Sequence, residues 1–228
     1  TFTGGVDANN TAVGYLAGNA ITTALRNSLL GANAGDSITT GSDNTYIGYS
    51  AGATNSSANS NTAVGRSALA NNLNSDRNTA VGYFALGNMS SSGSVDAYNT
   101  AVGYNAGVSV TSGVQNTLIG GLTGDAITSG DGNTALGYKA LENNSTGDYN
   151  NAIGFQALMS YSSADGTGHN VAIGVNTGLN VSSGTSNVLI GNFAGDGFTT
   201  GIDNVAIGTN TLSAANAGNR SVAIGKQA

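Results

Sequence analysis

Apolar and polar positions alternate over short stretches that recur along the chain. The stretch 10–14 reads NTAVG, and it returns almost unchanged at 61–65, 78–82 and 99–103. Short segments of period-two alternation, separated by Gly, Asn and Ser, are typical of β-strands joined by turns. Apolar residues do not recur at the spacing of an amphipathic helix, and the pattern therefore predicts an all-β chain.

The motif repeats with a nearly fixed period. Thirteen copies are each closed by a glycine, here called the motif glycine: Gly14, Gly31, Gly48, Gly65, Gly82, Gly103, Gly120, Gly137, Gly154, Gly174, Gly191, Gly208 and Gly225. The period is 17 in ten of the twelve intervals, and it is 21 after Gly82 and 20 after Gly154. This period, with β-branched residues and abundant Gly and Asn, predicts a parallel β-solenoid whose coils each contain two or three short strands. We expect about 13 coils in a single repetitive domain over 1–228, a fragment or processed segment of a fibre.

Alternation along each strand divides the motif side chains between two faces. The residue before the motif glycine is always a large aliphatic: Val13, Leu30, Ile47, Val64, Val81, Val102, Ile119, Leu136, Ile153, Ile173, Ile190, Ile207 and Ile224. We assign this aliphatic column to the interior, together with the Thr, Ser or Val two residues earlier. The residue between them is mostly alanine, and we assign it to the outside, where its small size suggests the close approach of another backbone, such as a second subunit.

Two positions after the motif glycine indicate how the core is filled. The fourth residue is Gly or Leu, and where it is Gly the seventh is usually bulky, as in Ile21 and Ile38, with Asn55 as the exception. Close packing penalises both a void and an excess of volume. We therefore expect these two positions to fill one pocket of the core in turn.

Asparagine opens the motif in twelve of the thirteen copies, with Ser221 in the other. Asn tolerates left-handed backbone at a corner, and its amide can bond to the same amide in the coils above and below. We therefore predict a structural ladder along the fibre. Its members are Asn10, Asn27, Asn44, Asn61, Asn78, Asn99, Asn116, Asn133, Asn150, Asn170, Asn187 and Asn204.

Composition narrows the classes of function. The net charge is −6 with a pI near 4.3, and the six basic residues are scattered, which argues against nucleic acid as a partner. No apolar run approaches the length of a membrane span, so membrane insertion is not expected. The chain has no cysteine, which excludes disulfides and thiol catalysis.

The copies NVAIG at 204–208, SVAIG at 221–225 and NTAVGY elsewhere resemble the head repeats of YadA-like trimeric autotransporter adhesins and the repeats of phage tail fibres. The resemblance implies a left-handed parallel β-roll. It also implies a homotrimer, with three chains side by side in an extracellular shaft or head on a virion tail or a bacterial surface. The coil of this chain is slightly longer than is typical of the adhesin heads.

Candidate contact residues are few. Five tyrosines follow motif glycines, namely Tyr15, Tyr49, Tyr83, Tyr104 and Tyr138, as does Phe155. Such an aromatic column would contact sugars, but packing of each ring over the turn below or against a neighbouring chain is the favoured interpretation. His169 is the only histidine, and we interpret it as a surface residue of an insertion rather than a base or ligand. Pairs such as Asp36 and Asp43 recur in turns, and turn chemistry explains them better than calcium binding. The insertions 88–98 and 159–169 are the first places to look for a receptor contact.

Three hypotheses follow for the function. The leading one is a structural and adhesive fibre segment without catalysis, cofactor or metal, binding a cell-surface glycan or receptor that the sequence does not identify. The alternative is a self-assembling extracellular filament whose subunits join end to end. The third is a solenoid that binds or processes carbohydrate along its aromatic edge. An ice-binding face is disfavoured, because the Thr column turns to Val from Val171 onward.

Overall fold

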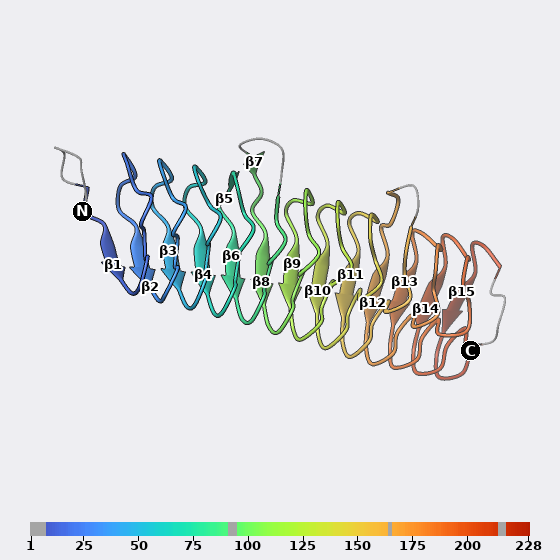
Figure 1. Ribbon diagram of the computed structural model, residues 1–228. Coiled ribbons are helices and arrows are strands. Elements are labelled where there is room, and N and C mark those ends of the chain that lie inside the picture. The colour runs from blue at the N-terminus through green and yellow to red at the C-terminus, as the bar shows by residue number, and fades with distance from the viewer. Residues whose placement is uncertain (1–7, 91–94, 164–165, 214–217) are drawn as a thin grey trace. The chain divides into compact units, whose positions relative to one another are not determined.

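The computed structural model describes residues 8–90, 95–163, 166–213 and 218–228, and these contain β-strands and turns but no helix. Contacts between residues group the chain into two units, 1–114 and 115–228. Each unit is a stack of coils that adds one short strand per coil to a parallel sheet (Figure 1). The predicted fold class, an all-β parallel β-solenoid with a 17-residue repeat, is confirmed.

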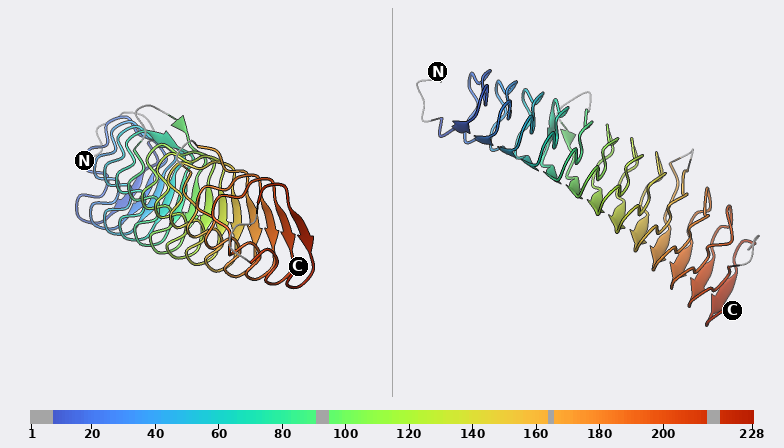
Figure 2. Two further views of the ribbon diagram at one scale, coloured as in Figure 1. Left: turned by 90° about the vertical axis from the view of Figure 1, so that its right-hand side faces the viewer. Right: turned by 60° about the horizontal axis from the view of Figure 1, so that its bottom comes forward.

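The motif strands are three residues long. In the first unit they are β1 (Thr11–Val13), β2 (Ser28–Leu30), β3 (Thr45–Ile47), β4 (Thr62–Val64), β6 (Thr79–Val81) and β8 (Thr100–Val102). In the second they are β9 (Thr117–Ile119), β10 (Thr134–Leu136), β11 (Asn151–Ile153), β12 (Val171–Ile173), β13 (Val188–Ile190), β14 (Val205–Ile207) and β15 (Val222–Ile224). Within each unit they pair in sequence order, side by side (Figure 2).

The register repeats from strand to strand. Val13 lies opposite Leu30, and Leu30 lies opposite Ile47, so equivalent residues form straight columns as predicted. The described part of a coil contributes one strand to this sheet instead of the expected two or three, because the remainder is built of turns. An extra pair, β5 (Ser75–Asp76) with β7 (Val95–Asp96), forms beside the first insertion.

The sequence-based assignment of the two faces is wrong. The alanine column points inward, and Ala63, Ala80 and Ala135 are completely buried. The aliphatic column points outward, where Ile47 is 38% exposed and Leu136 is 44% exposed. The Thr, Ser and Val residues two positions earlier share this outward face. The core of a coil is already filled by the alanine column together with the fourth and seventh positions after the motif glycine, as by Leu29 and Ile38, and it has no room for the aliphatic column as well.

Three positions of each coil share the core. A large residue in the alanine column occurs only where the fourth position after the motif glycine is Gly, as in the pair Leu29 and Gly35. A Cβ at Gly35 would lie 3.0 Å from Leu29 Cδ2 and 2.6 Å from Ile38 Cδ1. Where the fourth residue is Leu, as at Leu69 and Leu86, the column holds Ala. The expected compensation of volume between the fourth and seventh positions is therefore present. The alanine column, which the sequence-based assignment places outside, is the third position that takes part in it.

Tyr46 explains the one exception to the packing pattern. It occupies the alanine column of its coil, is completely buried, and accepts a hydrogen bond from Asn55 Nδ2. Its ring fills the space next to Gly52, where a Cβ would lie 2.4 Å from Tyr46 Cε2. Burial raises the pKa of the Tyr46 hydroxyl far above the ordinary tyrosine value. Asn55 therefore replaces an aliphatic residue because the core of this coil contains a hydroxyl group.

The corners of each coil use left-handed backbone. The residue two positions after the motif glycine has a positive φ in every described coil, as at Ser50 (54°), Phe84 (54°) and Lys139 (59°). The residue before the ladder asparagine does the same, as at Arg26 (58°) and Asp43 (62°). Non-glycine residues in this region carry a conformational cost of about 1 kcal/mol each. The stacked hydrogen bonds between coils must offset it.

Candidate functional site

The asparagine side chains form a buried ladder inside each unit. Asn27 is completely buried, and its Nδ2 donates to Asn10 Oδ1 at 3.1 Å and to Gly41 O at 2.9 Å. Its backbone N–H donates to the same Asn10 oxygen at 2.8 Å. The pattern recurs from Asn116 to Asn204 in the second unit. These residues tie coils together and are not available to a ligand.

The outward face of the motif strands is a broad uncharged surface. It consists of the aliphatic column and of the column two residues earlier, which holds Thr, Ser or Asn in the first nine coils and Val from Val171 onward. No position of either column holds a charged residue. From β12 to β15 this face is aliphatic at both positions, as in the pairs Val188–Ile190 and Val205–Ile207. Contiguous exposed apolar surfaces are uncommon on monomeric soluble proteins and often mark interaction sites.

The aromatic column lies along a second exposed edge. Tyr83 and Tyr104 stack with their centroids 5.4 Å apart and their planes 9° apart, and Tyr138 and Phe155 stack at 5.7 Å and 21°. Arg66 takes the place of an aromatic residue between Tyr49 and Tyr83, with its Cζ 5.7 Å from each centroid. Tyr15, one of the predicted contact residues, is 75% exposed. Stacking occupies ring faces within the column, so a ligand meets mainly the ring edges and hydroxyl groups.

A third exposed column, the corner column, precedes the ladder asparagines. Arg26 forms an ion pair with Asp43, with Nε 2.6 Å from Oδ1, and Arg220 approaches Asp203 at 3.6 Å. The hydrogen bond from Arg26 lowers the pKa of the Asp43 carboxyl group. His169 is exposed in this column, as predicted, and its ring stacks on Tyr149 at 5.5 Å. These contacts are arranged as pairs and do not converge on a common point.

The two insertions broaden the corner column. In the first, Arg77 pairs with Asp96, and its guanidinium lies 5.6 Å from the ring centroid of Tyr98. In the second, the buried Tyr161 hydroxyl donates to Thr167 O. Residues 91–94 and 164–165, which belong to the predicted contact regions, lie outside the described residues. The described parts of both insertions therefore present a stacked pair at the corner, Arg77 with Tyr98 and Tyr149 with His169.

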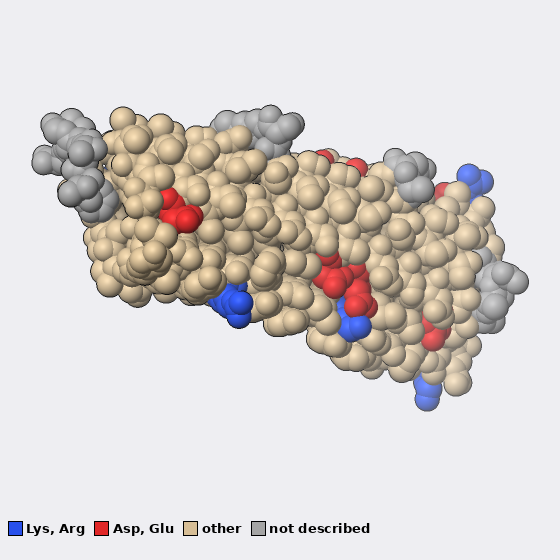
Figure 3. Space-filling model, viewed as in Figure 1, with Lys and Arg blue, Asp and Glu red and all other residues tan. Residues whose placement is uncertain are grey.

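Acidic residues gather beside one lysine in the second unit. Lys139 Nζ lies 2.8 Å from Glu142 Oε1, and it also lies 5.7 Å from the Tyr138 centroid. Partial burial raises the pKa of Asp125, and the Glu142 charge raises it further. Figure 3 shows a group of acidic side chains next to a basic one on a surface that is otherwise largely uncharged. Over the described ranges no group of three or more His, Asp or Glu residues could hold a metal ion.

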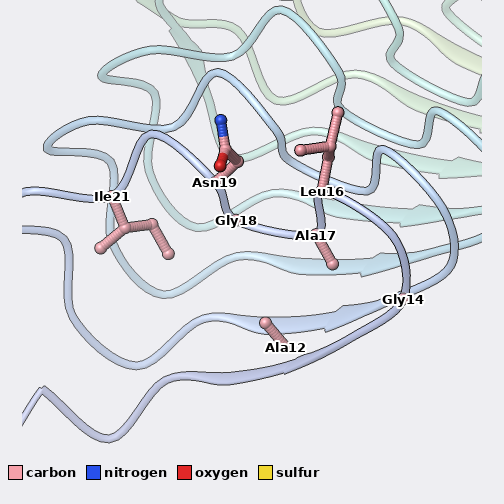
Figure 4. Close-up of a pocket in the computed structure, with 7 residues that line it drawn as sticks. All are labelled: Ala12, Gly14, Leu16, Ala17, Gly18, Asn19 and Ile21. Atoms are coloured by element: carbon pink, nitrogen blue, oxygen red, sulfur yellow. The ribbon is translucent and has the colours of Figure 1, made fainter. Parts of the chain in front are cut away.

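A small cavity opens in the coil of β1 (Figure 4). Its volume is about 280 Å³, and its lining is Ala12, Gly14, Leu16, Ala17, Gly18, Asn19 and Ile21. None of these side chains is charged or titratable. The cavity therefore provides shape and one amide but no group suited to catalysis.

Comparison with protein-family models, with curated proteins and with solved structures finds no match to this chain. A search of the described residues for membrane-spanning helices finds no segment long and apolar enough. The resemblance to adhesin heads and tail fibres therefore comes from the repeat motif alone.

Proposed function

We propose that the chain is a structural and adhesive fibre segment, of a phage tail fibre or a bacterial surface adhesin, that acts extracellularly and catalyses no reaction. In this role three copies pack side by side as a homotrimer through the uncharged outward face. The fibre holds binding parts away from the virion or cell. Stacked backbone hydrogen bonds, such as Gly31 N to Val13 O at 2.9 Å, resist the load on it.

The observation that carries this proposal is the outward aliphatic column. Ile47, Leu136 and Ile173 are each more than a third exposed, although the chain could have placed polar residues there at no cost to its core. Burying such a column against another chain gains about 25 cal/mol for each Å² of apolar surface removed from water. Because the column repeats in register, the gain accumulates coil by coil along parallel chains.

Mass in solution tests the assembly. We expect the wild-type chain to have the mass of three copies, and Leu136→Asp with Ile173→Asp to have the mass of one, because buried carboxylates oppose packing. Thermal unfolding of the variant monomer should change little, since both side chains lie outside the core of their own coil. Thr200→Asp, an exposed change away from this face, is the matched control and should leave the mass unaltered. A monomeric wild type contradicts the trimer, and a ladder of growing masses favours the end-to-end filament.

A further inference from the structure

The residues around the motif glycines contain no acidic side chain, although the protein is acidic. None of the twelve Asp and Glu residues lies between three positions before and four positions after a motif glycine. The same segments contain three of the six basic residues, Arg66, Lys139 and Lys226. In the first unit Arg66 is the only charged residue in these segments. In the first unit these segments therefore carry a single positive charge, which favours an anionic partner on a chain whose net charge is negative.

Arg66 differs from the other arginines in having no carboxylate beside it. Arg26, Arg77 and Arg220 each lie within 4 Å of an aspartate. Among the residues that the structure describes, no Asp or Glu oxygen comes this close to Arg66. Its neighbours in the column are instead the rings of Tyr49 and Tyr83, each 5.7 Å away. The guanidinium is held by the two rings and keeps its N–H donors for an external acceptor.

The surroundings of Arg66 suit a sugar ring that carries a carboxylate. A guanidinium binds a carboxylate through two parallel hydrogen bonds, which a lysine cannot reproduce. Tyr49 and Tyr83 are 53% and 39% exposed, and their hydroxyl groups can donate to or accept from sugar hydroxyls. Val64, directly before the motif glycine of the same coil, adds an apolar surface for the C–H groups of a sugar.

We propose that Tyr49, Arg66 and Tyr83 form a binding site for an acidic saccharide, in which Arg66 binds the carboxylate of a uronic acid unit and the tyrosines contact its hydroxyls. The site deepens the adhesive role proposed above, on which its biological use depends, by naming the class of surface that the fibre recognises. Lys139, which lies beside Tyr138 in the second unit, lacks this property because Glu142 already neutralises it. Lys226, at the position equivalent to Arg66, follows a coil with Thr209 in place of a tyrosine.

Titration of the full 228-residue chain with a galacturonic acid trisaccharide tests the site, with tyrosine ring signals followed by NMR. We expect binding to perturb two tyrosine signals that Tyr49→Phe and Tyr83→Phe identify. Arg66→Gln should weaken binding about tenfold or more, the usual effect of losing a charge-assisted pair of hydrogen bonds. Arg66→Lys should bind with an affinity between those of the wild type and Arg66→Gln. Arg77→Gln is the matched control, since Arg77 also lies over a tyrosine but is paired with Asp96, and it should bind as the wild type does.

The trisaccharide methyl ester and sodium acetate complete the experiment. The ester should bind at least tenfold more weakly than the acid, and acetate should bind more weakly than either saccharide. Equal binding by Arg66→Gln, equal binding of ester and acid, or acetate binding as tight as the trisaccharide overturns the site, as does the absence of binding. A trimer that does not bind uronate leaves the fibre proposal standing. A monomer that binds it contradicts only the assembly.

Discussion

The motif glycines are positions where the backbone leaves no room for a side chain. Their φ values lie between +127° and +142°, a region that other residues rarely adopt. The carbonyl group of the next motif glycine also lies directly in the path of a Cβ. At Gly65 that atom would be 2.5 Å from the oxygen and 2.7 Å from the carbon of Gly82. Conformation and close approach therefore require glycine independently.

Gly65→Ala should therefore destabilise the protein strongly. Strain at a φ of +131° and a clash with immovable backbone together predict a loss of about 2–4 kcal/mol in the free energy of unfolding. Urea unfolding followed by circular dichroism measures it. Gly218→Ala is the control, because a Cβ there meets no atom within 4 Å, and it should change the free energy by less than about 0.5 kcal/mol. Similar losses for both variants would contradict the close approach.

At the scale of the coil, the sequence predicts the period, the register and the asparagine ladder, but not which face is inside. Alternation shows that Ala63 and Val64 lie on opposite faces, but it does not show which of them faces the core. Average hydrophobicity favours Val64 inside, whereas the narrow coil accepts Ala63 there because Leu69 fills the remaining space. The sequence does contain a signal of the shared interior. Coils with Leu29, Leu118 or Leu189 in the alanine column each have glycine at the fourth position after the motif glycine, so the two positions compensate each other in volume.

The outward aliphatic face could not be predicted from one chain for a related reason. A solvent-facing Ile column offers no advantage to an isolated coil, so reasoning from a single solenoid places it inside. The stacking within the aromatic column was likewise hidden, since sequence spacing does not tell whether Tyr83 packs on Tyr104 or on the turn below. The place of Arg66 between two tyrosines became meaningful only with the column geometry.

A double-mutant cycle tests the shared interior. Ala80→Leu alone should overpack the coil beside Leu86 and cost about 1–3 kcal/mol, and Leu86→Gly alone should leave a cavity and cost about 3–5 kcal/mol. The double variant recreates the arrangement of Leu29 with Gly35, with Met89 as the third partner. We expect it to be more stable than the sum of the single effects predicts, by about 1–3 kcal/mol. Additive losses would show that the two positions fill separate spaces.

At the scale of the whole molecule, the carboxylates of the described residues lie away from the motif strands, and their environments differ. Asp125 is partly buried beside Glu142, which raises its pKa. Asp43 is exposed and bonded to Arg26, which lowers its pKa. An acid whose pKa rises on folding costs stability once it is ionised, whereas an acid whose pKa falls contributes stability when ionised. The two groups therefore respond to pH in opposite directions.

Asp125→Asn should raise the thermal midpoint at pH 7, where the wild-type carboxylate is ionised at a cost. The gain should be smaller than about 1 kcal/mol, because water screens a partly exposed group. At pH 3 the wild-type acid is protonated in both states, and the difference should disappear. Asp43→Asn, the contrasting variant, should bring no gain at pH 7. A gain from Asp125→Asn that persists at pH 3 would point to packing instead of charge.

The register between consecutive coils has an evolutionary consequence. Because each motif strand meets its neighbour through the same Cα pairing, removing one whole repeat inside a unit joins two strands that already match. Length can then change in steps of about 4.8 Å without a new contact having to be selected. The near-copies at 29–44, 118–133 and 189–204 are suitable templates for unequal recombination. The length of the solenoid can thus be inherited and can vary independently of the side chains on its surface.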